Sequence, residues 1–170
     1  MMNRNVILIA AMAMMSPLIL PAQSTQPQPP VLWEGVGPVI AGSVDLSQLP
    51  KEAREFLKKL FKDKTVTKCE LEFTDHSYDI DLADGTDIEF DSKGQWTEVD
   101  AGNRRVLPMD LVRHLIPDMA RKEIERRGLA GSIETIKRST RGYKVEFRGT
   151  DIDDIRFDSH GRVLKINLDD

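Results

Sequence analysis

Cysteine and histidine are scarce in this 170-residue chain. Cys69 stands alone, which excludes an internal disulfide framework and a zinc site built on cysteines. We expect Cys69 to be a small residue on a strand, with an intermolecular disulfide as the alternative. The three histidines are scattered without the regular spacing of zinc ligands, so we predict no zinc site and no cofactor.

Long apolar runs are absent after residue 20. Before that point, Arg4 is followed by an almost wholly apolar stretch from Val6 to Leu20, which is short for a membrane span. This arrangement is typical of a secretory signal, and we predict a signal peptide over residues 1–22 that is cleaved near Ala22. An uncleaved membrane anchor is the alternative. Cleavage would leave a periplasmic or secreted protein without stable membrane insertion.

Aromatic residues make up only 6% of the chain, and no basic stripe is interleaved with them. This composition argues against nucleic acid as a partner. Charged residues are abundant at 31%, but their signs are unevenly divided. Residues 49–100 contain 8 Lys and Arg against 14 Asp and Glu, whereas residues 101–170 contain 15 against 12. Either both halves are ordinary solvated surfaces, or the acidic half attracts a cationic partner or the other half of the molecule.

A proline-rich segment separates the predicted signal from the rest of the chain. The run Gln26-Pro27-Gln28-Pro29-Pro30 cannot form a helix or the interior of a sheet. We therefore predict a Pro/Gln-rich linker over residues 23–45.

An internal repeat organises the remaining sequence. The segment DIEFDSKG at residues 87–94 recurs as DIRFDSHG at residues 154–161, an offset of 67. One unit of about 50 residues would form only a small hydrophobic core, whereas two units can share a larger core. We predict a first repeat over residues 46–100, followed by a connection and a second repeat over residues 101–170.

Each repeat is predicted to contain one main helix. Pro50 suits the first helical position, and apolar residues follow it at helical spacing. They are Ala53, Phe56, Leu57, Leu60 and Phe61. In the second repeat, the helix is expected to start at Pro117 and to end at Gly128 as a left-handed cap. A short extra turn or helix is expected over residues 107–112, in the connection.

Four antiparallel strands are predicted to follow each helix. In the first hairpin, a three-residue loop with Gly85 left-handed pairs Ile80 with Ile88. This register keeps one face of the hairpin apolar, whereas a two-residue Asp-Gly turn would mix the faces. Aromatic residues recur at core-facing positions in both repeats, and Trp96 is the one that we expect to be partly exposed.

The predicted fold class is α+β. Two tandem units, each a helix and four antiparallel strands, are expected to join into one sheet of about eight strands. Both helices would cover the apolar face of this sheet, and the polar face would remain open.

The candidate binding residues lie on this polar face. They are Asp79, Asp81, Asp87, Glu89, Lys144, Glu146, Arg148 and Arg156. In the first hairpin, Asp79 would face Glu89, an unfavourable pairing of like charges that a cation or a basic surface would relieve. The acids miss the spacing of an EF-hand calcium loop by one residue and lack a Glu at its twelfth position, so no set of metal ligands is predicted. The alternatives are a solvated face screened by salt, or a basic partner, which could be the helices or the polar face of the second repeat.

No catalytic residue is predicted. Asp75-His76-Ser77 contains the residue types of a hydrolytic triad, but three adjacent residues cannot converge on one substrate, because triads are assembled in space. We interpret these residues as a polar hairpin turn and expect that the protein is not an enzyme.

Several short motifs recur in the same order in both repeats. The first copy contains Leu49-Pro50, Tyr78, Asp84-Gly85, Ile88, Phe90-Asp91, Gly94 and Trp96, and the second contains Ile116-Pro117, Tyr143, Val145, Phe157-Asp158 and Gly161. Together they span residues 46–168 and resemble the PepSY-like family of secreted or periplasmic proteins, which is common in Bacteroidetes. One departure is Gly149-Thr150-Asp151-Ile152-Asp153, where the family has a compact Asn/Asp-Gly turn, so we expect a longer or bulged hairpin there.

The resemblance implies a fold like that of the β-lactamase inhibitor protein, and it implies little chemistry. Our first hypothesis is a monomeric, non-catalytic, inhibitor-like binding module that holds a protein or peptide partner on its polar sheet face. The alternative is a cation-binding (calcium) or envelope-stress protein that uses the acidic first hairpin.

Overall fold

The computed structural model describes residues 39–40, 45–102 and 104–169. The predicted signal peptide and most of the predicted linker lie outside these residues. None of the described helices has the length and apolar composition needed to cross a membrane.

Three helices and nine strands form within the described residues. In chain order they are β1 (Val39–Ile40), α1 (Lys51–Leu60), β2 (Thr65–Glu72), β3 (Ser77–Leu82), β4 (Asp87–Phe90), β5 (Trp96–Asp100), α2 (Met109–Leu115), α3 (Asp118–Arg126), β6 (Ile133–Ser139), β7 (Gly142–Phe147), β8 (Ile152–Phe157) and β9 (Val163–Leu168). Each predicted repeat therefore supplies one main helix and four strands, and α2 is the extra helix expected in the connection.

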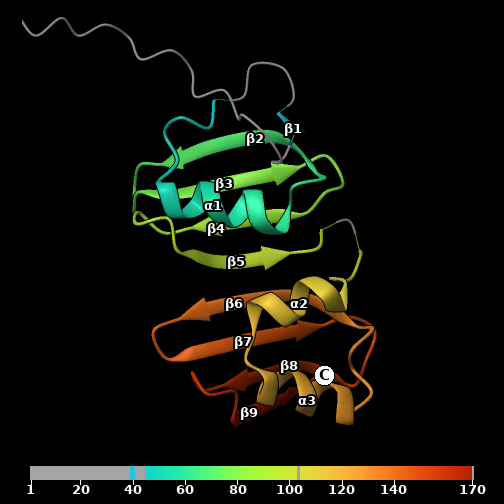
Figure 1. The fold of residues 1–170 in the computed structure, drawn as a ribbon. Coiled ribbons are helices and arrows are strands. Elements are labelled where there is room, and N and C mark those ends of the chain that lie inside the picture. The colour runs from blue at the N-terminus through green and yellow to red at the C-terminus, as the bar shows by residue number, and fades with distance from the viewer. Residues whose placement is uncertain (1–38, 41–44, 103, 170) are drawn as a thin grey trace, which may run out of the picture.

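All nine strands form one sheet in chain order (Figure 1). Strands β2 to β9 pair antiparallel, which confirms the predicted α+β class with one antiparallel sheet. The ninth strand, β1, adds parallel to β2, with Val39 opposite Thr65 and Ile40 opposite Val66. The sequence pattern does not predict β1, because two residues inside the predicted linker are too few to show a strand periodicity.

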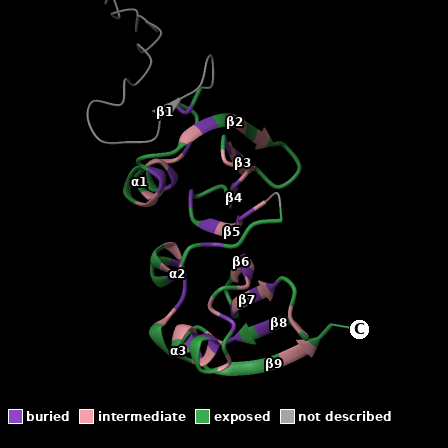
Figure 2. Cartoon of the chain, turned by 90° about the vertical axis from the view of Figure 1, so that its right-hand side faces the viewer, coloured by how far each residue is buried: buried purple, intermediate pink, exposed green. Residues whose placement is uncertain are grey.

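All three helices lie on the same face of the sheet (Figure 2). Helix α1 buries Ala53 and Leu57, and α3 buries Ala120 and Ile124 at the equivalent positions of the second repeat. The buried apolar residues of both repeats form a single core cluster. No described helix covers the opposite face, so the predicted arrangement of helices is confirmed.

The prolines precede the main helices rather than occupying their first positions. Pro50 and Pro117 are N-caps with extended backbone, at ψ values of 152° and 150°. The amide of Arg54 donates to the carbonyl of Pro50 at 3.2 Å, which shows that the N-cap carbonyl accepts the first helical bond. At the end of α3, Gly128 has a φ of +76°, which confirms the predicted left-handed cap.

The first hairpin has the predicted register. Ile80 pairs with Ile88, and Gly85 has a φ of +86°. The amide of Leu82 donates to the carbonyl of Thr86 at 2.9 Å, as a three-residue loop requires. The equivalent loop between β7 and β8 is longer, in agreement with the departure seen in the sequence.

The expectation that Trp96 is partly exposed is wrong, because its side chain is only 7% exposed. Its ring stacks on that of Phe56, with the ring centroids 6.2 Å apart. The guanidinium carbon of Arg138 also lies over the Trp96 ring, 4.7 Å from its centroid. Arg138 belongs to β6, so the second repeat covers this ring because the sheet continues past β5.

Replacing Gly85 by valine is expected to destabilise the fold by roughly 1–3 kcal/mol, because a β-branched side chain is strained at positive φ. Chemical denaturation measures the loss. Gly131→Val is the control, because a Cβ atom at Gly131 meets nothing within 4 Å and the backbone there is not left-handed. An unchanged midpoint for Gly85→Val would mean that the hairpin register is wrong.

The two repeats are expected to fold only together. Strand β5 pairs with β6, with Val99 opposite Ile136, so cutting between them would expose an edge strand and divide the shared core. Fragments 23–102 and 103–170 should be largely unfolded or aggregated, and the whole chain should melt in one transition by calorimetry. A well-folded monomeric fragment, or two independent transitions, would contradict a shared core.

Candidate binding face

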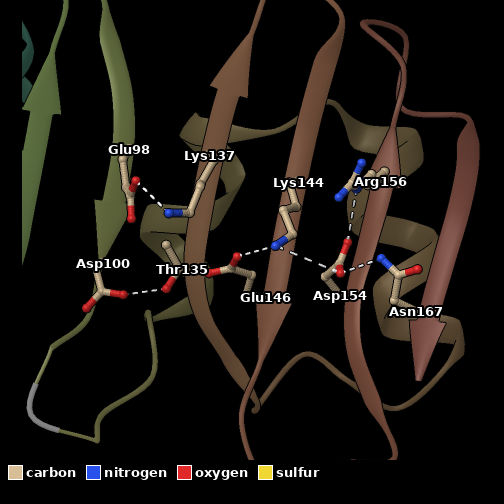
Figure 3. A network of polar contacts seen from close by, with 9 residues as sticks. All are labelled: Glu98, Asp100, Thr135, Lys137, Lys144, Glu146, Asp154, Arg156 and Asn167. Carbon is tan, nitrogen blue, oxygen red and sulfur yellow. Dashed lines mark hydrogen bonds and ion pairs between the residues drawn. The ribbon is translucent and has the colours of Figure 1, made fainter. Parts of the chain in front are cut away.

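Charged side chains line the face of the sheet that the helices leave open. Along β3, the buried Ile80 alternates with Asp79 and Asp81. Figure 3 views the same face over the second repeat, where Lys144 and Arg156 lie in front of the strands and the helices lie behind them. Seven of the eight predicted residues stand on strands β3, β4, β7 and β8 at positions of this face, which we call the polar face.

One row of charged residues crosses the polar face at matched register, and we call it the central row. From β2 to β9 its members are Glu70, Asp79, Glu89, Glu98, Lys137, Lys144, Arg156 and Lys165. The members from the first repeat are all acidic, and those from the second repeat are all basic. Since adjacent strands lie about 4.8 Å apart, the row is about 34 Å long.

The sign of the central row changes between β5 and β6. There, the Nζ of Lys137 donates a hydrogen bond of 2.8 Å to the Oε2 of Glu98 (Figure 3). Burial alone would lower the pKa of Lys137, but this hydrogen bond and the neighbouring carboxylates raise it above its ordinary value. Elsewhere along the row, each charged residue stands opposite residues of its own sign.

Sequence reasoning missed four members of the central row. They are Glu70, Glu98, Lys137 and Lys165. The alternation of residues along the sequence predicts which residues face each other only within one regular hairpin. It does not predict the partners in the neighbouring ladders, because these contain β-bulges, such as the one between Glu89 and Phe90. The repeat offset of 67 could have found them, because it maps Glu70 onto Lys137 and Glu98 onto Lys165.

A second row of polar residues runs beside the central row. From β2 to β9 its members are Lys68, Asp81, Asp87, Asp100, Thr135, Glu146, Asp154 and Asn167. Unlike the central row, it contains carboxylates in both repeats. Asp100 accepts a hydrogen bond from the hydroxyl of Thr135, which ties β5 to β6 a second time (Figure 3).

Asp154 is the buried member of the second row, with a side chain only 2% exposed. Its Oδ2 accepts a hydrogen bond of 2.6 Å from Asn167 and lies 3.9 Å from the Nζ of Lys144, while its Oδ1 lies 3.5 Å from the Nε of Arg156 (Figure 3). The same Nζ of Lys144 donates to the Oε1 of Glu146 at 2.5 Å. Because a buried carboxylate depends on nearby cations, Lys144 and Arg156 also support the fold.

The acidic half of the polar face is only partly neutralised. The Nζ of Lys68 lies 3.0 Å from the Oδ2 of Asp79 and 3.0 Å from the Oε2 of Glu70, and these hydrogen bonds raise the pKa of Lys68. Burial, together with the charges of neighbouring carboxylates, raises the pKa of Asp87 and also that of Glu89. Folding therefore disfavours the ionised form of both carboxylates, because burial and the carboxylates around each of them oppose its charge.

Two hollows border the polar face at equivalent places in the two repeats, and each is lined in part by residues of the central row. The acidic hollow, of about 380 Å³, is lined by Glu72, Thr74, Asp75, Ser77, Asp79 and Glu89. The basic hollow, of about 400 Å³, has the cations Lys137, Arg138, Arg141, Lys144 and Arg156 in its lining, beside apolar groups such as Leu164. Of the predicted site residues, Asp79 and Glu89 thus meet at one hollow, and Lys144 and Arg156 meet at the other.

Three predicted residues, Asp81, Asp87 and Glu146, belong to the second row and line neither hollow, and Arg148 is the one predicted residue outside both rows. It follows the end of β7 and forms an ion pair with Glu134 of β6, outside both rows. This placement comes from the irregular end of the ladder, where the register shifts between Ile133 and Thr135.

Asp75, His76 and Ser77, which have the residue types of a triad, lie at the turn between β2 and β3, as predicted. The Oδ1 of Asp75 accepts hydrogen bonds from the amide of Ser77 at 3.1 Å and from its hydroxyl at 2.7 Å. His76 occupies the same turn at a φ of +60°. Cys69 lies on β2, as predicted, where partial burial raises the pKa of its thiol to about 11.

Asp87→Asn is expected to stabilise the fold at pH 7 by about 0.2–1 kcal/mol, because it removes a carboxylate that faces Asp81. The raised pKa means that folding favours the protonated form, so wild-type stability should rise relative to Asp87→Asn as the pH falls toward the ordinary value of 3.8. Thermal unfolding at pH 7 and pH 4 checks both effects. The exposed Asp63→Asn is the control, and an advantage of Asp87→Asn that persisted at low pH would contradict the repulsion.

Known proteins resemble this chain over most of the described residues. The family model "Putative beta-lactamase-inhibitor-like, PepSY-like" matches residues 76–165. A "putative periplasmic protein of unknown function" from Bacteroides vulgatus is 32% identical with a TM-score of 0.59, and the match covers 72% of this chain and 94% of that one. A "putative calcium-regulated periplasmic protein" from Bacteroides thetaiotaomicron is 27% identical with a TM-score of 0.58, and the match covers 71% and 91% of the two chains. No curated protein matches the chain significantly.

These matches confirm the resemblance carried by the repeated motifs, and they confirm the expected location outside the cytoplasm. The family model spans more than half of the chain, and the similar structures are those of proteins described as periplasmic. The chain belongs to the PepSY-like family of beta-lactamase-inhibitor-like proteins, and it is a periplasmic protein.

Proposed function

We propose that this protein is a non-catalytic binding module that holds a protein or peptide partner on its polar face. The central row supports this proposal most directly, because it places eight charged residues on a sheet face that no described helix covers. Along most of this row, residues of like charge stand opposite each other, which is unfavourable for the isolated fold. A partner of complementary charge would remove that repulsion.

The size of the polar face also suits a protein partner. The row is about 34 Å long, and strands of five or six residues are about 17–20 Å long, so the face covers on the order of 600–700 Å². Specific protein interfaces bury about 800 Å² on each partner. The inhibitor-like description of the family agrees with this role, as an analogy of fold.

A non-catalytic role is supported by the residues that resemble a triad. The hydroxyl of Ser77 donates a hydrogen bond to the Oδ1 of Asp75 within the turn, rather than to His76 as a nucleophile paired with a histidine base would.

Capture from a periplasmic extract by the immobilised protein tests the binding function. Asp87→Lys combined with Glu89→Lys is expected to reduce the captured partner at least tenfold, because it reverses charge on the polar face. The matched control is Glu52→Lys combined with Glu55→Lys, which makes the same change of charge on the exposed side of α1. Equal capture by wild type and both variants, or no specific capture, would contradict binding by the polar face.

A second candidate function is calcium binding by the acidic hairpin of β3 and β4. The similar Bacteroides thetaiotaomicron protein is described as calcium-regulated, and Asp81 stands directly opposite Asp87. In the described part of the chain, no three His, Cys, Asp or Glu residues are placed to hold a metal ion, so calcium would have to rearrange the side chains.

Thermal unfolding with and without millimolar calcium tests this second function. Calcium binding predicts a rise of several degrees in the midpoint, which Asp81→Asn abolishes and Asp63→Asn preserves. A midpoint that does not respond to calcium would contradict this function. An equal rise with magnesium, or an equal rise with calcium in Asp81→Asn, would contradict it too.

A further inference from the structure

The two repeats carry opposite charges at equivalent positions of the sheet. Asp79 stands opposite Glu89 in the first repeat just as Lys144 stands opposite Arg156 in the second. The same equivalence extends to the outer strands of each repeat, which contribute the remaining members of the central row. All four acidic members thus have basic counterparts: Glu70 and Lys137, Asp79 and Lys144, Glu89 and Arg156, Glu98 and Lys165.

The charges of both halves remain available to a partner. Among the described residues, Glu89 and Asp87 form no ion pair in the acidic half, and Arg141 and Lys165 form none in the basic half. The acidic and basic hollows are centred four strands apart, on β3 and β7, which is a distance of about 19 Å. Each hollow has room for one or two side chains of a partner.

We propose that the docking segment of the partner is bipolar, with a basic cluster that enters the acidic hollow and an acidic cluster about 19 Å away that enters the basic hollow. This inference rests on the binding function proposed above. A partner of one charge would be attracted by one half of the central row and repelled by the other.

A second copy of this chain would be complementary in charge along the central row but not along the second row. If two polar faces met with acidic halves over basic halves, Asp87 would approach Glu146, and Asp81 would approach the buried Asp154. Those like charges would oppose association, so we assign the face to a different protein.

Labelled peptides provide a direct test with the full-length protein. The block peptide has four lysines, two glycines and four glutamates, and in an extended conformation the centres of its charged blocks lie about 20 Å apart. The alternating peptide has the same composition with lysines and glutamates interspersed. At low salt, we expect the block peptide to bind at least tenfold more tightly than the alternating peptide, and we expect added salt to weaken its binding.

Charge reversal in the basic half tests the bipolar arrangement. Arg141→Glu combined with Lys165→Glu should remove the preference for the block peptide and raise the affinity for a peptide of lysines alone. These two residues are exposed and do not neutralise Asp154, so the fold should be retained. Lys58→Glu combined with Lys59→Glu makes the same change of charge on α1 and should preserve the preference.

The outcomes separate this inference from the proposed function. Equal affinities for the block and alternating peptides, or a block preference that survives Arg141→Glu with Lys165→Glu, would show that the partner is not bipolar. If capture still depends on the polar face in that case, the binding function stands without the bipolar partner. If capture is independent of the polar face, the binding function itself is wrong.

Discussion

The backbone pairing of β5 with β6 is the interaction on which the rest of the structure depends. It turns two four-stranded units into one sheet, lets the buried residues form a single core, and brings Arg138 over the ring of Trp96. Without it, each unit would have one main helix over a small sheet, with an edge strand left unpaired. The polar face would then be two separate patches rather than one continuous surface.

The same pairing gives the central row its register, so that acids and bases meet only at Glu98 and Lys137. The two halves of the face are supported differently. In the basic half, Lys144 and Arg156 lie beside the buried carboxylate of Asp154 and compensate its charge. In the acidic half, Lys68 lies beside Asp79 and compensates only part of the negative charge. Keeping like charges in rows costs stability, and proteins often accept such a cost at surfaces that select a partner.

Burial explains how far the sequence could predict this structure. The main helices and the register of the first hairpin follow from apolar spacing, because only one arrangement hides Ile80 and Ile88 together. Pairings of charge within a hairpin follow from the same register. Strand β1, the burial of Trp96 and the full central row depend on contacts between distant segments and on bulges, which local periodicity does not encode.

Native-state hydrogen exchange of the backbone amides in β5 and β6 tests most directly whether the two repeats share one sheet. A continuous sheet predicts that the hydrogen-bonded amides of β5 and β6 exchange only through global unfolding, with the same free energy as those of β3 and β7. Exchange of β5 and β6 through a lower-energy opening, while β3 and β7 stay protected, would show two separate units and would contradict a single continuous binding face.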